Sequence, residues 1–477
     1  SLDLAATGVP GGSGVDFTLT PGDAIRAHRI RLVAGDGPLT VGATLDARGD
    51  RAGRIELVGR DGVALTDSAA LLASASGGLE RMRGTRRQPG LFDAGYQGGT
   101  VEVAAPQGAV TMADGAEIDL AGTNALADGT LVSADTGTLR LVSARAGDAI
   151  DLSGIAAGLE GVGALELLGY TPYDAGDFDA ALADVDVSAT LSTALEAIAD
   201  RTVAADLVIS AAGDFTIDAG RVAALNALFD GAAAPGRVTL RAGGDLTLAG
   251  DLVDGRIDAT NLAAAVDREV DDPSEIADTG RSWSIALVAG AEAGTVERTA
   301  LAPVPATLRI DGDIGTGTGD IVLAASEDVV FGTDARVLST GRHVDDPDTE
   351  ALEYLGSFGG FDDGLTLASR LGGVSLPETG GRIDLRAGRR IEFPDSLENI
   401  QKLGYRDFLA LTGADSDTEG AIGRRLDPFS DLPRSWGFVI ENIPAGTVAS
   451  LAGGDVSVAS GQTVRGGHAI QRLHHVP

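Results

Sequence analysis

Three aspartate doublets are the residues whose type and spacing come closest to catalytic chemistry. They are Asp271-Asp272, Asp345-Asp346 and Asp362-Asp363. Paired carboxylates serve as general acid and base when an Arg, Lys or His lies beside them. These doublets lie in loop-like stretches without a fixed basic companion, and Lys402 is the only lysine of the chain. We therefore interpret them as solvated turns, and predict that the chain has no catalytic residues and is not an enzyme.

The histidines do not form a recognisable metal-ligand set. They are His28, His343, His468, His474 and His475, and none has the H-E-x-x-H spacing of a zinc site. The chain has no cysteine that could complete a zinc site. G-x-S-x-G and G-K-[ST] sequences are absent as well. We therefore predict no catalytic metal and no cofactor, with calcium as the one exception that remains open.

Calcium binding remains a possibility for two reasons, a single glycine-rich passage and the net charge of the chain. Gly11–Leu19 (GGSGVDFTL) fits the calcium-binding nonapeptide except for Thr18 at its hydrophobic position. That nonapeptide binds the ion only when tandem copies stack, so a single copy is more simply a Gly-rich turn. The net charge of −34 is explained by solubility, with cation binding as the alternative.

Two further features could contact a macromolecular partner. Arg48-Gly49-Asp50 is an Arg-Gly-Asp triplet of the kind that suits integrin recognition, but so short a motif also arises by chance in a chain rich in these residues. Trp283 and Trp436 could stack on a sugar ring if they were exposed. Both lie in alternating, strand-like passages, which favours burial. The ligand-binding residues therefore stay unknown at this point.

The composition indicates which elements must position these residues. The 477 residues include 68 glycines, while aromatic residues make up only 4% and hydrophobic residues 44%. That hydrophobic fraction is too high for a disordered chain, and a compact core would lack its usual ring fillers. Small aliphatic residues with frequent turn-formers suit many short strands rather than a few large helices. The composition is that of a repeat protein.

Pairs of apolar residues at alternate positions recur along most of the chain. Ile55 and Leu57 are followed eight residues later by Val63 and Leu65. The same spacing joins four further sets of pairs: Leu207/Ile209 to Phe215/Ile217, Val238/Leu240 to Leu246/Leu248, Ile321/Leu323 to Val329/Phe331, and Ile383/Leu385 to Ile391/Phe393. A strand of about five residues and a turn of about three fill this spacing. Because a sandwich needs longer strands, we predict an all-β parallel β-helix with coils of roughly 20–25 residues.

The alternation is interrupted in places, and these interruptions define the predicted organisation. We expect coils over 1–157, an insertion with a short helix over 158–206, and coils again over 207–396. A helical and loop insertion follows over 397–434, and terminal coils and a tail over 435–477. Helical spacing in Ala189–Arg201 and in Leu397–Leu411 supports the two insertions, and Asn261–Thr279 is expected to be a loop or short helix.

Four passages in the second half of the chain resemble the filamentous haemagglutinin-type exoproteins of two-partner secretion. They are Thr279–Gly290 (TGRSWSIALVAG), Arg309–Phe331, Gly380–Arg389 (GGRIDLRAGR) and Ser435–Val458 with its LAGGDVSV, in the order and approximate spacing of the C-terminal haemagglutinin-associated domain. Residues 1–157 resemble generic haemagglutinin coils. The resemblance implies a right-handed β-helix, secretion to the surface of a Gram-negative bacterium through an outer-membrane partner, and attachment to cells or surfaces without an active site.

We therefore expect a structural and adhesive segment of a large secreted surface exoprotein, and an internal piece of a longer chain. Its partners would be the outer-membrane transporter and host or bacterial surface glycans or proteins. Two alternatives stay open: a polysaccharide lyase or hydrolase on the same fold, and a self-assembling surface fibre. The acidic field argues against nucleic-acid binding. No apolar stretch approaches 18 residues, so no membrane insertion is expected.

Overall fold

The computed structural model is mostly β and contains large parallel sheets. It describes residues 2–6, 17–49, 52–75, 80–83, 91–94, 98–125, 131–232, 234–254, 281–295, 297–333, 335–339, 381–393, 447–450, 456–465 and 468–469. The chain divides into two compact units. Unit 1 comprises Ser1–Ile209 with Gly294–Ala300, and unit 2 comprises Ser210–Ala293 with Leu301–Pro477.

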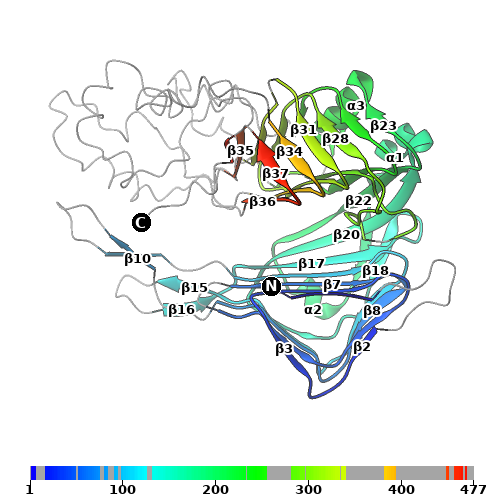
Figure 1. Cartoon of the computed structure of the whole chain (residues 1–477). Helices are drawn as coiled ribbons and strands as arrows, with labels where there is room; N and C mark the ends of the chain where they lie inside the picture. Colours follow the sequence, from blue (N-terminus) through cyan, green and yellow to red (C-terminus); the bar gives the residue numbers. More distant parts are fainter. Residues whose placement is uncertain are drawn as a thin grey trace, which may run out of the picture. The chain divides into compact units, whose positions relative to one another are not determined.

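In unit 1 the chain passes repeatedly through three parallel sheets in a fixed order (Figure 1). The first sheet contains β1 (Leu2–Ala6), β4 (Arg29–Ala34), β7 (Arg54–Gly59), β12 (Thr100–Ala105), β17 (Gly137–Ala144), β20 (Val162–Asp174) and β22 (Arg201–Ala211). The second contains β2 (Phe17–Leu19), β5 (Leu39–Val41), β8 (Gly62–Leu65) and β13 (Ala109–Met112). The third contains β3 (Ala24–Arg26), β6 (Thr44–Asp46), β9 (Ala70–Leu72), β14 (Glu117–Asp119) and β19 (Gly158–Glu160).

Several elements of unit 1 stand outside that order. β10 (Glu80–Arg83) and β11 (Leu91–Ala94) form an antiparallel hairpin, as do β15 (Gly122–Ala125) and β16 (Leu131–Ala134). β18 (Ala149–Leu152) pairs in parallel with β21 (Ser188–Leu191). The helices are the 3-10 turn η1 (Ala175–Asp177), α1 (Phe178–Ala183) and α2 (Thr193–Glu196). Residues 158–206 therefore hold three short helical elements and also contribute β19, β20 and most of β22 to the sheets.

Unit 2 repeats the same order with its own strands. Its first sheet contains β24 (Arg237–Ala242), β27 (Ser284–Ala289), β30 (Ile321–Ala325), β33 (Ile383–Ala387) and β36 (Val456–Ser460). The second contains β23 (Phe215–Ile217), β25 (Leu246–Leu248), β28 (Thr307–Ile310), β31 (Asp328–Phe331), β34 (Arg390–Glu392) and β37 (Thr463–Arg465). The third contains β26 (Leu252–Val253), β29 (Ile314–Thr316), β32 (Val337–Ser339), β35 (Thr447–Ser450) and β38 (His468–Ala469).

One longer helix lies in unit 2, α3 (Ala219–Gly231), between β23 and β24. The predicted helical insertion over 397–434 and the predicted loop over 261–279 lie outside the described residues.

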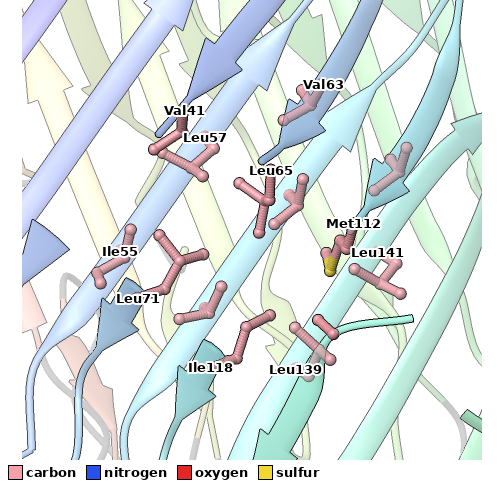
Figure 2. Close-up of a cluster of buried hydrophobic side chains, with 14 of the residues drawn as sticks. Val41, Ile55, Leu57, Val63, Leu65, Leu71, Met112, Ile118, Leu139 and Leu141 are labelled. Carbon is pink, nitrogen blue, oxygen red and sulfur yellow. The ribbon is translucent and has the colours of Figure 1, made fainter. Parts of the chain in front are cut away.

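The core of unit 1 is built by stacking similar aliphatic residues from one strand onto the next. Ile30 pairs with Ile55, which pairs with Val101, and the column continues through Leu139 to Leu165. All five side chains have no exposed surface. Figure 2 shows members of this core gathered between the strands. Because strands in register lie about 4.8 Å apart, side chains at matching positions touch, and aliphatic residues fill the interior without rings.

Candidate functional surface

The structure places only part of the residues that the sequence singled out. The three aspartate doublets, Trp436, His343 and the His474-His475 pair lie outside the described residues, as do residues 11–16 of the glycine-rich passage. Residues 17–19 of that passage form β2. Among the described residues, no group of three or more Asp, Glu, His or Cys side chains is placed to hold a metal ion. The catalytic and calcium hypotheses therefore remain predictions from the sequence.

Trp283 is buried, as its alternating context predicted. Its side chain has no exposed surface, and its ring centroid lies 5.5 Å from that of Phe229 in α3. The Trp283 backbone amide donates to a carboxylate oxygen of Asp254 at 2.8 Å, and Asp254 is itself fully buried. Since a buried ring cannot stack on a sugar, Trp283 is part of the core of unit 2 and not of a glycan-binding surface.

Arg48 of the Arg-Gly-Asp triplet is held by an internal ion pair. Its Nε and Nη2 atoms donate to the two carboxylate oxygens of Asp46 at 2.9 and 3.0 Å. These hydrogen bonds lower the pKa of Asp46, so the carboxylate stays charged. Gly49 forms a bridge to Ala75 of the next round, while Asp50 lies outside the described residues. An integrin-type partner would have to compete with Asp46 for the guanidinium.

A row of charged residues runs across the outer face of the first sheet of unit 1. The register aligns Asp3, Arg31, Glu56, Glu102, Arg140 and Glu166 on successive strands. We call this row the charge ladder. Arg31 bonds Asp3 and Glu56, each at 3.1 Å, and Arg140 bonds both Glu102 and Glu166.

Two further residues extend the ladder within unit 1. The Glu297 carboxylate lies 2.5 Å from the guanidinium of Arg31, and Arg54 reaches Glu102 at 3.5 Å. Burial works against the charge of Arg31, but Glu56, Glu297 and Asp3 outweigh it and raise the pKa of the guanidinium. The ladder is thus a network of paired, half-buried charges. Its members are occupied with one another.

The corners of unit 2 carry aspartates that bind the backbone of the following round. A carboxylate oxygen of Asp214 accepts the amide of Asp245, and Asp245 in turn accepts the amide of Thr307, at 2.9 and 2.7 Å. At a second corner Asp251 accepts the amide of Asp313, and Asp313 accepts that of Arg336, at 2.8 and 2.9 Å. Much of the acidity at these turns therefore serves to join rounds, because charged acceptors make strong hydrogen bonds to amides.

The region after β20 is anchored by one arginine. Arg145 is almost fully buried and donates to the carboxylate and the carbonyl oxygen of Asp184, at 2.7 and 3.0 Å. The Tyr173 hydroxyl donates to the same carboxylate. Burial and this carboxylate raise the pKa of Tyr173 to about 12, which leaves the phenol protonated and unsuited to act as a base. The cluster fastens the segment that contains α1.

The two hairpins are the part of unit 1 least engaged in the sheets. Figure 1 shows the β10–β11 and β15–β16 hairpins extending to one side of the parallel sheets, and β11 contacts β15. They extend from the sheets in successive rounds, one after β9 and the other after β14. In a repeat fold such excursions carry most of the variation that recognition requires. Both hairpins lie within residues 1–157, which were predicted to form continuous coils, because strands of four residues do not stand out from the alternation.

No protein-family model, no curated protein and no solved structure matches this chain. In the part of the chain that the structure describes, no helix has the length and apolar character to cross a membrane.

Proposed function

We propose that this chain is a segment of a right-handed parallel β-helix that forms the shaft of a large secreted bacterial surface exoprotein and mediates attachment. The observation that carries the proposal is the order of the strands. In both units the chain visits three parallel sheets in turn, and each strand pairs with the strand of the next round. Connections between parallel strands of one sheet are right-handed in nearly all proteins, which supports that hand.

The spacing between rounds supports the same architecture. Arg31 and Glu56 are aligned on neighbouring strands and lie 25 residues apart in the sequence. Coils of roughly 20–25 residues are usual for parallel β-helices, where each round contacts only its neighbours.

The resemblance to filamentous haemagglutinin-type exoproteins supplies the rest of the proposal. Its passages fall on strands of unit 2: TGRSWSIALVAG includes β27, and GGRIDLRAGR includes β33. We propose export of the parent chain through an outer-membrane transporter, and attachment to glycans or proteins on host or bacterial surfaces, without catalysis. We place the contact surface on the two hairpins of unit 1, because they leave the sheets side by side.

The test is binding of the purified, labelled chain to an array of glycans and matrix proteins, with and without calcium. Saturable binding to a defined set of components is expected. A variant in which residues 76–97 are replaced by a short Gly-Ser linker removes the β10–β11 hairpin and should lose that binding. A matched variant that shortens the excursion of residues 175–183, which includes α1, and retains Asp184 as the partner of Arg145 should keep it.

Three outcomes would oppose the proposal. A blank array would reduce this segment to a spacer, and equal binding by the hairpin variant would place the contact elsewhere. Depletion of a glycan during the assay would revive the lyase or hydrolase alternative. Far-UV circular dichroism of each variant establishes that the parallel sheets persist, so that a loss of binding can be assigned to the hairpin.

A further inference from the structure

The third sheet of unit 2 starts at β26, and a helix stands where the preceding round would supply a strand. Between β23 and β24 the described residues form α3 and no strand of the third sheet. α3 packs against both β23 and β26 (Figure 1 shows it beside β23). The edge of β26 that faces away from β29 is therefore covered by α3. The backbone N–H and C=O groups of a helix bond within the helix, so they cannot pair with this strand edge as a neighbouring strand would.

The backbone of β26 shows which of its groups face that edge. Leu252 and Asp254 donate their amides to carbonyl oxygens of the next round, at 2.7 and 3.0 Å. Successive residues of a strand direct their backbone groups to opposite sides. The carbonyl of Asp251 and the amide of Val253 therefore face the edge on which α3 lies.

One side chain of α3 meets both of these groups. The Asn226 Nδ2 atom donates to the carbonyl oxygen of Asp251 at 2.8 Å, and its Oδ1 atom accepts from the amide of Val253 at 3.2 Å. In a parallel sheet, one residue of a neighbouring strand would donate its amide to the first group and accept from the second with its carbonyl. The carboxamide of Asn226 thus takes the place of one residue of a missing strand.

The helix is fixed in this position by its own contacts. Asp218 caps its first turn by accepting the amide of Arg221 at 3.0 Å, and the Arg221 guanidinium donates to the carbonyl of Thr216 and lies 5.3 Å from the ring of Phe215. On the inner face Leu225 and Phe229 have no exposed surface. Val222, which is also buried, lies four residues before Asn226 and therefore on the same face of the helix. With Val222 and Leu225 packed inward, Asn226 lies on the side of α3 that faces β26.

We propose that α3 is an edge guard: it occupies the strand-accepting edge of β26 through Asn226 and prevents an extended strand of a second copy of this chain from pairing there. An uncovered strand edge is a template for pairing with another chain. This inference does not depend on the adhesive function, since it concerns only the edge of one sheet.

The first test measures backbone amide exchange in the full chain carrying Asn226→Leu. The substitution keeps the size of the side chain and removes both hydrogen bonds. We expect exchange of the Val253 amide to accelerate roughly three- to tenfold, the amount that one hydrogen bond supplies. The Asp254 amide, which bonds the next round, should stay unchanged. Unchanged exchange at Val253, or equal acceleration at both residues, would overturn the assignment.

The second test removes the guard and measures association by sedimentation velocity. Ala223 is exposed on α3, so Ala223→Pro breaks the helix without taking a side chain from the core. Concentration-dependent association is expected for this variant, and not for the control Ala223→Ser. Adding Val253→Pro, which deletes the amide that strand addition needs, should abolish the association. Continued association of the double variant, or a monomeric Ala223→Pro protein with intact sheets, would overturn the proposal. If Ala223→Pro does not fold, the exchange ratio at Val253 and Asp254 decides alone.

Discussion

The two units join their rounds with a different balance of polar contacts. In unit 1 the charge ladder links side chain to side chain across the outer face of the first sheet, from Asp3 to Glu166. In unit 2 many of the links run from side chain to backbone, as when Asp245 accepts the amide of Thr307, and they stand beside the ion pairs of Asp328 with Arg389 and Arg390. Aliphatic residues line the interior of both units, and unit 2 adds the buried rings of Trp283 and Phe229. The comparison shows that one repeat geometry can be secured in two ways.

Buried hydroxyls add to the second kind of link in unit 2. Thr316 and Ser339 are aligned on neighbouring strands of the third sheet, and both are fully buried. The Ser339 hydroxyl donates to the carbonyl of Gly317 at 2.6 Å and accepts the amide of Gly381 at 2.7 Å. The Thr316 hydroxyl donates to the carbonyl of Gly319 at 2.6 Å. These side chains bond backbone groups of residues that flank the strands of their own and neighbouring rounds.

The difference has a physical consequence. Interactions between charged side chains near the surface are weakened by salt, since the Debye length falls to about 3 Å at 1 M salt. Hydrogen bonds from a buried hydroxyl to the backbone are not screened, and their loss leaves polar groups buried without partners. We therefore expect the stability of unit 2 to depend on a few hydrogen bonds whose individual loss lowers the free energy of unfolding strongly. The stability of unit 1 should depend on many ion pairs whose individual loss has a small effect.

The largest effect is expected from Ser339→Ala in unit 2. The substitution removes two hydrogen bonds of a fully buried hydroxyl, one to the carbonyl of Gly317 and one from the amide of Gly381, so the free energy of unfolding should fall by roughly 2–3 kcal/mol. Urea unfolding followed by circular dichroism measures it. The control is Ser153→Ala in unit 1, whose hydroxyl bonds Asp151 at an exposed site and should change stability by less than about 0.5 kcal/mol. Equal effects of the two substitutions would contradict the comparison.

A smaller effect is expected from Glu102→Gln in the charge ladder. Glu102 is 7% exposed and lies 3.4 and 3.5 Å from the guanidinium nitrogens of Arg140 and Arg54. Arg140 keeps Glu166 as a partner, so we expect a loss of about 1 kcal/mol at low salt.

Salt distinguishes this loss from that of Ser339→Ala. In 1 M sodium chloride the effect of Glu102→Gln should shrink in part, limited by the burial of Glu102 and Arg140, while the effect of Ser339→Ala should not change. Unfolding curves of both variants at two salt concentrations provide the measurement. A salt-independent effect of Glu102→Gln would mean that the ladder acts through packing, not through charge.

Acid should weaken unit 2 through Asp328, whose carboxylate bonds Arg389 and Arg390 of the next round. Burial raises the pKa of Asp328, but hydrogen bonds from Arg389 and Arg390 outweigh it and hold the pKa at about 2, below the usual 3.8. A depressed carboxyl pKa stabilises the folded state above pH 3.8, and this contribution is lost as the pH falls toward 2. The stability difference between the wild-type chain and Asp328→Asn should therefore narrow across that window.

Asp313 provides the opposite case in the same unit. Burial raises the pKa of its carboxyl, against the effect of Arg336, so its charged form is disfavoured in the folded state. Protonation of Asp313 therefore relieves a cost as the pH falls through the folded pKa, which is the reverse of the behaviour of Asp328. Urea midpoints of Asp313→Asn and Asp328→Asn between pH 6 and 2 should shift in opposite directions relative to the wild type. Parallel shifts would contradict the assignment.

The alternation of apolar and polar residues allowed many of the strands to be predicted from the sequence. Ile55, Leu57, Val63 and Leu65, paired in the sequence by an eight-residue spacing, lie in β7 and β8 and are at most 2% exposed. A strand that buries one face must alternate, so the pattern identifies its inward residues directly. The mostly β, parallel character of the fold follows from repeating that pattern through short strands.

The hydrogen bonds and ion pairs that join the rounds could not be predicted from the sequence, because the two residues of each pair are far apart in it. Asp313 accepts the amide of Arg336, 23 residues on, and is itself bonded by its amide to Asp251, 62 residues before. Helix α3 was also missed, although Asp218 is a good N-cap and Val222, Leu225 and Phe229 have helical spacing. Its apolar residues stand between two strand pairs and were assigned to the coils on either side.

The smallest effect on stability is expected from Asp46→Ala. This substitution also tests whether the Arg48-Gly49-Asp50 triplet takes part in integrin recognition. Asp46 binds Arg48 at an exposed corner of unit 1, so its loss should lower the free energy of unfolding by about 0.5 kcal/mol or less. The substitution also releases the guanidinium of Arg48. If the triplet served adhesion, integrin binding by the labelled chain should then increase, and Asp46→Ala/Arg48→Ala should abolish the gain. We expect no binding by any of the three proteins, because Arg48 serves to hold the corner together. Binding that rises on release of Arg48 would show that the ion pair masks a recognition site, and the charged contacts of unit 1 would then do more than join its rounds.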